Sequence, residues 1–508
     1  METSASQSPS FSLLHDKQWF QLSLLVATLL FLLWFRFPTI STGLPYFTQE
    51  DEAHHFNRVV RMVQSGNWDP EYFHKPSLHF YLRMPIVALS FLWNVREGHI
   101  RKIEEIQTKN PYGIAGYSFT ASHIGIVKWN RAFSVLLIML SLWLTYLVAF
   151  ELTSSFFLSL IALILAGVSP ELLRYSGTIG VDVVMTFFCL LTTYLATRFK
   201  KEDPLSSLLA LGVCAGLAVS SKYNALPIMG LPLFVCLLNK RFNAQSILVS
   251  LLSPVVGFFL GSPYILASLP LFLNQFAYEI WHYGVAGHVG HTAEPGTEQA
   301  IFYTKWLASD GLGTLGALLT LFGVLALLKK PNRKALSALW FPLFFFLLMV
   351  SQRANFTRNM IVVIPFAACF VAYGLSTLLR FFSPTSILRP IAVGVVLLFL
   401  IGEPVTRAFE IRFAMASQED SRDSLSTWIR SGKLTGETAI SGKLWASREV
   451  TTLPSLTQYD PSQDTPLDLY LQGYTNIITG PKGLEHQIPL LNNLTSTLKE
   501  FPGETTPQ

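Results

Sequence analysis

Apolar stretches of membrane-spanning length recur along almost the whole of this 508-residue chain. Only 14% of its residues are charged, against about 25% in ordinary soluble domains, so lipid is the solvent for most of the chain. The sequence therefore predicts an all-α polytopic membrane protein with about 11 transmembrane helices. The predicted spans cover 19–37, 131–150, 155–170, 182–198, 204–221, 225–239, 245–267, 311–329, 336–351, 359–380 and 387–403.

Three basic groups, at 198–201, 240–241 and 329–334, set the predicted topology. Lys and Arg accumulate in cytoplasmic loops, so all three groups, together with residues 1–18, are expected inside. The outside face then collects 38–130, 169–182, 221–224, 268–310, 351–359 and everything after 403. The net charge of +5 lies mostly in short loops, so it indicates topology and no nucleic-acid partner.

The segment 78–95 decides the parity of this topology. It is apolar but interrupted by Arg83 and Pro85. The count of spans holds only if the segment does not cross, so it is interpreted as a helix on or in the outer interface. If it does cross, one basic marker or the orientation of the N-terminus is wrong.

A change in composition near residue 404 divides the chain into domains. Residues 19–403 form the predicted membrane domain, whose first outside loop, 38–130, carries juxtamembrane helices. Residues 404–508 are more polar, with short alternating runs and a helix-like segment at 424–429. About 100 residues suffice for a small domain, so we expect a compact α/β domain on the outside.

Two adjacent carboxylates, Asp51 and Glu52, follow the first span. Apolar residues at helical spacing come after them, so the pair is expected to open a helix, where carboxylates are stabilised by the helix dipole. Capping of this kind is compatible with a second role, in which either carboxylate is the general base of a membrane enzyme. His54 and His55 next to Asp51 are weak candidates for divalent-metal ligands, and a metal cofactor stays open.

Charged groups mark the edges of several other spans on the predicted outside face. Ionisable groups at membrane depth cost free energy, so each one needs a reason. One reason is that they are solvated loop ends, salt bridges or snorkelling side chains. The other is that they converge to bind a ligand phosphate, as cations and imidazoles do. The candidate substrate-binding residues are His74, Lys75, Asp182, Lys222, Arg353 and Arg358.

These blocks, in this order, resemble the polyprenyl-phosphate-dependent membrane glycosyltransferases of the GT-C class. The likeness is closest to the branch of protein O-mannosyltransferases and lipid A aminoarabinose transferases (glycosyltransferase family 39-like). It is carried by the acidic segment 49–52, by 66–68 with 72–76, by 169–170 with 180–182, by 222–224, and by 358–359 with Pro365. It covers about 19–403. His74 stands where some relatives carry an acid, and Ser77 replaces a second proline.

The resemblance implies a GT-C-like fold and an inverting sugar transfer on the non-cytoplasmic face of the plasma (inner) membrane. A polyprenyl-phosphate-linked sugar would be the donor, and a hydroxyl of a lipid, glycan or protein the acceptor. Asp51 or Glu52 would be the base, while Lys75, Lys222 and one of the two arginines would stabilise the leaving phosphate. The alternative is a polytopic transporter or lipid-linked-sugar flippase, but such proteins carry charges near the bilayer midplane and show internal symmetry.

Overall fold

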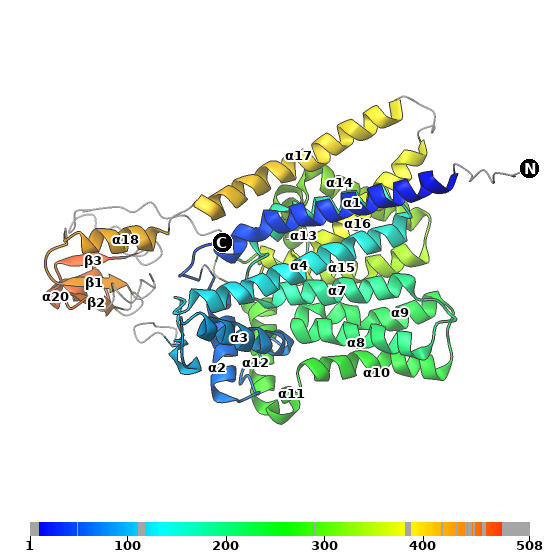
Figure 1. Ribbon diagram of the computed structural model, residues 1–508. Coiled ribbons are helices and arrows are strands. Elements are labelled where there is room, and N and C mark those ends of the chain that lie inside the picture. The colour runs from blue at the N-terminus through cyan, green and yellow to red at the C-terminus, as the bar shows by residue number, and fades with distance from the viewer. Residues whose placement is uncertain are drawn as a thin grey trace, which may run out of the picture. The chain divides into compact units, whose positions relative to one another are not determined.

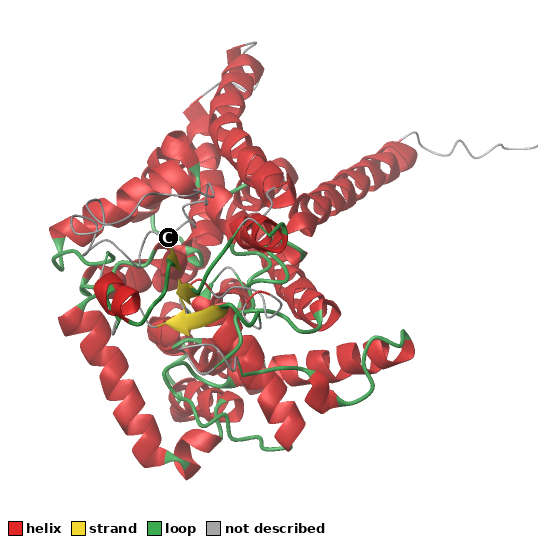
Figure 2. Cartoon of the chain, turned by 90° about the vertical axis from the view of Figure 1, so that its left-hand side faces the viewer, coloured by secondary structure: helices red, strands yellow, loops and turns green. Residues whose placement is uncertain are grey.

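The structure is a computed structural model that describes residues 10–47, 49–109, 117–288, 290–381, 388–417, 420–432, 434–441, 444, 450, 453–459 and 464–479. Parts of the predicted segments 1–18 and 404–508 thus lie outside the described residues. Helices dominate, and three short strands form one sheet (Figure 2). Contacts divide the chain into two units, one of residues 1–40, 69–82 and 131–413, the other of residues 41–68, 83–130 and 414–508.

The first unit is a bundle of apolar helices. Helices α3, α4 and α17 run on from it into the second unit. The elements are α1 (Ser10–Arg36), η1 (Phe37–Ile40), α3 (Leu78–Arg96), α4 (Ile124–Thr153), α5 (Phe156–Gly167), α6 (Pro170–Arg174), α7 (Val181–Arg198), α8 (Leu205–Ser221), η3 (Tyr223–Gly230), α9 (Leu231–Leu238), α10 (Ala244–Gly261), α11 (Tyr264–Ala267), α12 (Leu269–Trp281), η4 (His282–Ala286), α13 (Thr297–Trp306), η5 (Leu307–Gly311), α14 (Gly313–Lys329), α15 (Arg333–Val350), η6 (Thr357–Met360), α16 (Val363–Leu378), η7 (Leu379–Phe381) and α17 (Leu388–Ser417).

Small residues bring the bundle helices close together. Helix α8 packs between α7 and α10, and α16 packs against both α5 and α14 (Figure 1). A Cβ atom on Gly216 of α8 would lie 2.0 Å from the carbonyl oxygen of Pro254 in α10, and one on Gly257 would lie 2.3 Å from that of Val213. Close backbone approach through glycine is how helices associate in lipid, where no hydrophobic force holds them together.

The predicted spans correspond to helices of this bundle. Among the described residues, seven helices are long and apolar enough to cross a membrane, and four shorter apolar helices accompany them. The span predicted at 245–267 is wrong in its extent, because α10 ends at Gly261 and the chain turns at Ser262 before α11. Pro263 explains the break, since proline lacks an N–H and disfavours a helical residue before it.

Two further boundaries differ from the sequence pattern. Residues 78–96 form one continuous helix, α3, which by length and composition is itself among the seven that could cross a membrane. Its placement in the interface stays a prediction. Helix α17 continues through Pro404 to Ser417, beyond the composition change at 404. Within that extension Arg407 lies 3.9 Å from Glu403, one turn earlier, so an ion pair bridges the proline turn.

One end of the bundle gathers the basic loops. Glu151, at the end of α4, pairs with Arg198 at 3.8 Å and with Lys334 at 2.5 Å. Three helices begin at this end with side-chain caps, because Ser155, Asn243 and Asn332 accept backbone N–H groups of the first turns of α5, α10 and α15. Two of the three predicted basic markers, Arg198 and Lys334, therefore share one end, as the topology requires.

The second unit contains α2 (Glu50–Ser65), η2 (Ile103–Glu105), α18 (Ser421–Arg430) and a small α/β fold. Its sheet has the order β2-β1-β3 with all strands parallel, from β1 (Thr438–Ser441), β2 (Leu456–Tyr459) and β3 (Asn476–Ile478). Ile440 packs with α18, and its neighbour Ala439 packs with Leu469 of α20 (Pro466–Leu471). Successive strand residues face opposite sides, so a helix covers each face.

Helical bundle and small α/β unit together confirm the predicted fold class. The helix expected at 424–429 lies within α18, the alternating run at 437–440 overlaps β1, and the run at 474–478 contains β3. Within the second unit the hydroxyl of Tyr46 donates to Asp423 at 3.1 Å, and the guanidinium of Arg422 lies over the Tyr46 ring. These contacts fix segment 41–47 on α18.

Candidate functional site

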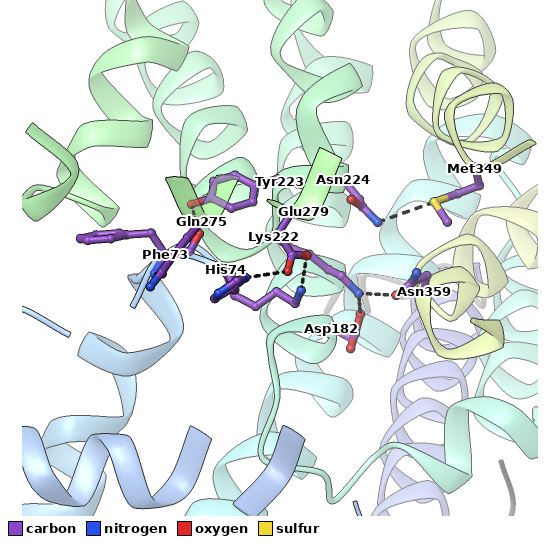
Figure 3. Close-up of polar contacts among 11 residues, drawn as sticks. Phe73, His74, Asp182, Lys222, Tyr223, Asn224, Gln275, Glu279, Met349 and Asn359 are labelled. Carbon is purple, nitrogen blue, oxygen red and sulfur yellow. Dashed lines mark hydrogen bonds and ion pairs between the residues drawn. The ribbon is translucent and has the colours of Figure 1, made fainter. Parts of the chain in front are cut away.

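A buried lysine stands at the end of the bundle opposite the basic loops. Lys222, directly after α8, donates to Asp182 Oδ1 at 2.5 Å and to Asn359 Oδ1 at 2.6 Å (Figure 3). Lys222 is 4% exposed, and Asn359 is fully buried. Asp182 lies in the first turn of α7 and Lys222 follows the last turn of α8, where the helix dipoles favour a negative and a positive charge respectively.

A second lysine lies at the same end. Lys75 Nζ donates to Glu279 Oε2 of α12 at 2.6 Å, and His74 Nδ1 lies 3.0 Å from the other carboxylate oxygen (Figure 3). The Lys75 ammonium is also 5.6 Å from the centroid of the Tyr283 ring. One carboxylate therefore holds both the lysine and the histidine of segment 74–75.

Backbone hydrogen bonds fix the segment that carries these two residues. The N–H of Phe73 donates to Gln275 Oε1 of α12, and the N–H of Ser77 donates to Ser262 Oγ at 2.9 Å. Pro76 fixes its own φ and biases Lys75 toward an extended backbone, so the segment is stiff. These hydrogen bonds therefore fix the position of the Lys75 backbone.

Tyr223 links the two lysines. It follows Lys222 in the chain, its hydroxyl donates to the carbonyl of Phe73 at 2.9 Å, and its ring packs on Phe276 at 4.8 Å. Lys75 and Glu279 lie close enough to act electrostatically on the Tyr223 phenol. The two ammonium groups and their carboxylates thus belong to one cluster, which we call the lysine cluster: His74, Lys75, Asp182, Lys222, Glu279 and Asn359.

The electrostatics of the lysine cluster favour its charged state. Burial raises the pKa of the Glu279 carboxyl, but hydrogen bonds and charges from His74 and Lys75 outweigh burial and hold that pKa below its ordinary value. Glu279 is therefore ionised at neutral pH. Two lysines pair with two carboxylates, so positive and negative side chains are equal in number in these two pairs.

A second buried acid lies on the neighbouring helix α6. Glu171 is 3% exposed and 3.8 Å from Arg174, and it hydrogen-bonds the side chain of Thr357. Burial raises the pKa of Glu171 and raises that of Tyr175 to about 12. Because Thr357 opens η6, this acid helps to fix the turn that carries Asn359.

The two predicted arginines contact an aromatic ring and a carboxylate. Arg358 lies over the ring of Phe356 at 5.3 Å and acts electrostatically on Tyr175. Arg353 forms an exposed ion pair with Glu294 at 2.5 Å. Its backbone N–H donates to Tyr283 at 2.8 Å, so the main chain of Arg353 positions the ring that faces Lys75.

The predicted acidic pair belongs to the second unit. Helix α2 begins at Glu50, as the pattern predicts, and places Asp51 and Glu52 in its first turn. Glu52 is 1% exposed and interacts electrostatically with Arg83, which is fully buried. Asp51 is half-buried. The two carboxylates thus differ in environment, one tied to a buried guanidinium and the other nearer solvent.

The two candidate metal ligands make other contacts. His54 Nε2 lies 3.2 Å from Arg58, and its ring meets Tyr117 edge to face. His55 is buried. No group of three or more His, Cys, Asp or Glu side chains that could hold a metal ion occurs in the described part of the chain.

Two members of the lysine cluster were not predicted as site residues. Glu279 has no sequence neighbour that marks it as the partner of Lys75, since 204 residues separate them. Asn359 is uncharged and follows Arg358, whose charge made it the predicted site residue of this segment. The sequence signal for Glu279 was its place in a loop expected on the same face as Lys222. Asn359 lies in such a loop as well, and it also belongs to the 358–359 motif of the family resemblance.

Part of the chain matches a known protein family. Residues 117–284 match the family model of dolichyl-phosphate-mannose-protein mannosyltransferases, a segment that includes Asp182, Lys222 and Glu279. Comparison of the sequence with curated proteins gives no significant match.

Among solved structures, the chain resembles ArnT from Cupriavidus metallidurans bound to undecaprenyl phosphate, at a TM-score of 0.51 and 14% identity over 83% of this chain and 82% of ArnT. It also matches the S. cerevisiae protein O-mannosyltransferase Pmt1-Pmt2 complex bound to the sugar donor, with a TM-score of 0.33 and 20% identity over 51% of this chain and 33% of that one. The likeness to ArnT shows that the chain has a GT-C-like fold.

Proposed function

We propose that this chain, a GT-C-like membrane protein with a mannosyltransferase-like segment, is a glycosyltransferase that uses a polyprenyl-phosphate sugar as donor. The observation that carries the proposal is the lysine cluster. Lys222 and Lys75 are held as preorganised cations at one end of a helical bundle, each by one carboxylate. Fixed cations in a water-poor site stabilise charge that develops on a leaving phosphate.

The chemistry follows from that charge. The acceptor hydroxyl oxygen attacks the anomeric carbon while the bond from this carbon to the phosphate oxygen breaks, with inversion. The electron pair goes to the phosphate, which becomes a dianion next to Lys75 and Lys222. The hydroxyl proton goes to a carboxylate base. A single donor to a developing oxyanion contributes about 10²–10³-fold in rate.

Asp51 is the better candidate for the base. Glu52 is buried and interacts with Arg83, so it would have to give up a charge partner to accept a proton. Asp51 sits one residue earlier in the same helical turn and is half-buried. We therefore assign proton abstraction to Asp51 and a supporting role for α2 to Glu52.

The remaining predicted residues take supporting roles. Asp182 pairs with Lys222 and holds it in place, and His74 shares Glu279 with Lys75. Arg353 orders the backbone around Tyr283, while Arg358 stands at the start of the turn that carries Asn359.

Orientation belongs to the proposal as well. The end with Glu151, Arg198 and Lys334 is rich in lysine and arginine, which marks cytoplasmic loops. The lysine cluster, at the other end of α7, would then face the non-cytoplasmic side of the plasma (inner) membrane. The donor would be a hexosyl or pentosyl polyprenyl phosphate, and the acceptor a hydroxyl of a lipid, glycan or protein.

A transporter or flippase is less well supported. Such proteins bind their substrates near the bilayer midplane, on broken helices of repeated halves. Here the buried ion pairs lie at helix ends, with Asp182 at the start of α7 and Lys222 just after α8.

The direct test is transfer of radiolabel from polyprenyl-phosphate sugars, beginning with the mannosyl form, in membranes that contain the protein. Lys222→Met is expected to lower the rate at least about 100-fold, since it removes a cation at the leaving phosphate. Lys334→Met, which removes an exposed ammonium at the opposite end, should retain wild-type activity. EDTA is expected to leave the rate unchanged. Wild-type transfer by the Lys222 variant would overturn the proposal.

A further inference from the structure

One buried hydrogen-bond donor of the lysine cluster has no partner. Asn359 is fully buried in η6, and its side-chain nitrogen Nδ2 makes no hydrogen bond with any described residue. The orientation of the amide is fixed, because the Lys222 ammonium can only donate and therefore faces the oxygen, Oδ1, at 2.6 Å. The NH₂ group is then not used in the contact with Lys222.

Burying an amide N–H without an acceptor costs free energy, so the unsatisfied side-chain NH₂ of Asn359 needs an explanation. Lys222 offers a second unused donor: its ammonium has three hydrogens, and the hydrogen bonds to Asp182 and Asn359 account for two. Lys222, directly after α8, and Asn359 of η6 are hydrogen-bonded to each other, and each therefore keeps one unused donor.

We propose that Asn359 Nδ2, together with the third hydrogen of Lys222, binds an anionic phosphate oxygen of the polyprenyl-phosphate donor. This inference rests on the proposed function and names a contact residue beyond the lysines. The set consists of a cation and neutral N–H groups, which suits an oxygen that only accepts. A sugar hydroxyl would also need an acceptor for its own proton, and Asn359 Oδ1 is already engaged by Lys222.

The alternative is that Asn359 only holds Lys222 in place. Asn359→Asp separates the two roles, because aspartate has the same shape, keeps an oxygen for Lys222 and replaces the NH₂ group with a second oxygen. If Asn359 is only a support, this variant should behave like the wild type. If Asn359 donates to the phosphate, the variant should lose donor affinity although Lys222 stays in place.

The experiment uses the full-length protein in lipid nanodiscs, with undecaprenyl phosphate as the binding probe. We expect Asn359→Asp to bind the probe at least tenfold more weakly and to raise KM for the polyprenyl-phosphate sugar by a similar factor, at an unchanged melting temperature. Asn359→Ala, which removes the donor without adding charge, should weaken binding in the same direction. Asn239→Asp, at the other end of the bundle, is the control for an amide-to-carboxylate exchange.

The outcomes are distinct. Wild-type probe affinity and KM in Asn359→Asp would overturn the inference and leave the proposed function standing. If neither Asn359 variant reaches the wild-type melting temperature, the amide is a structural residue and the inference also falls. Absence of both probe binding and sugar transfer in the wild type would overturn the proposed function itself. An increase in KM for the acceptor alone would assign Nδ2 to the acceptor and not to the phosphate.

Discussion

Single residues at the helix ends combine stability with chemistry. Lys222 and Lys75 each pair with one carboxylate, and such a pair offsets part of the cost of burying an ammonium group. A phosphate that enters the cluster can take over those hydrogen bonds, whereas an apolar group cannot. In the proposed function these contacts therefore have two roles, one in stability and one in anion binding.

The two acidic residues of α2 should respond differently to removal of their charge. Asp51→Asn is expected to lower the transfer rate by about 10²–10⁴-fold, the usual contribution of a general base, at normal expression and melting temperature. Glu52→Gln should instead lower the melting temperature, because Arg83 loses a buried charge partner. Rates from radiolabel transfer and melting curves distinguish the two. Wild-type turnover by Asp51→Asn would exclude Asp51 as the base.

Glu279 makes the stability of the lysine cluster dependent on pH. Its pKa lies below the ordinary value of 4.5, since burial, which raises it, is outweighed by His74 and Lys75. A carboxyl with a lowered pKa stabilises the folded state above its unfolded pKa, and this contribution is lost as pH falls through the folded pKa. Glu279→Gln should therefore melt roughly 2–4 °C below the wild type at pH 7, and the gap should narrow below pH 4.5.

Melting temperatures in detergent between pH 7 and pH 3.5 measure this gap. Glu294→Gln is the matched control, since its pair with Arg353 is exposed and an exposed ion pair contributes little. A gap that stays constant or widens on acidification would contradict the assignment.

At the scale of elements, the bundle depends on backbone contact between helices and on capped helix ends. Arg36 caps two helix ends. Its fully buried guanidinium donates to the carbonyl oxygen of Gly167 at 2.6 Å and to that of Leu32 at 3.2 Å. These carbonyls lie in the last turns of α5 and α1, where the helix dipoles are negative. The buried charge is thus offset by two helix ends.

The contact between α8 and α10 should tolerate no added side-chain volume. Gly257→Val would force a side chain against the carbonyl of Val213, and overpacking of this kind costs about 1–3 kcal/mol. Its melting temperature in detergent should fall. Gly402→Ala in α17, where a Cβ meets no atom within 4 Å, should leave the melting temperature unchanged or raise it. Equal stability of the two variants would refute glycine-mediated packing here.

At the scale of the whole chain, the bundle has two chemically different ends. Helix α7 runs from Asp182 in the lysine cluster to Arg198 beside Glu151. An apolar helix with opposite charge patterns at its two ends separates two aqueous phases, so the ends should be accessible from opposite sides of the membrane.

Cysteine labelling tests this orientation. Glu294→Cys, exposed in the segment held by Arg353, should react with an impermeant maleimide added to the non-cytoplasmic side of intact cells. Lys330→Cys, exposed after α14, should react only after the membrane is permeabilised. Of the four native cysteines, three are buried and Cys214 is half-buried, which keeps the background low. The reverse pattern would invert the proposed topology.

The sequence by itself determined the helical membrane class, the order of the spans and the shared end of the basic loops at Arg198 and Lys334. These features follow from local patterns: apolar runs of spanning length must be helical in lipid, and basic residues mark one side. The apolar pattern does not predict the break at Ser262, because the flanking residues are mostly apolar. Pro263 is the local signal for this break.

Only the tertiary structure decided which charges are partners. Lys75 meets Glu279 and Lys222 meets Asn359 across 204 and 137 residues, and no local pattern encodes such contacts. The same holds for Glu52, whose burial beside Arg83 distinguishes it from Asp51 although the two are adjacent in the chain. The charge of each residue and the helical periodicity can be determined from the sequence. Ion pairs, the burial of side chains and an unsatisfied donor such as Asn359 Nδ2 arise only when distant helix ends pack together.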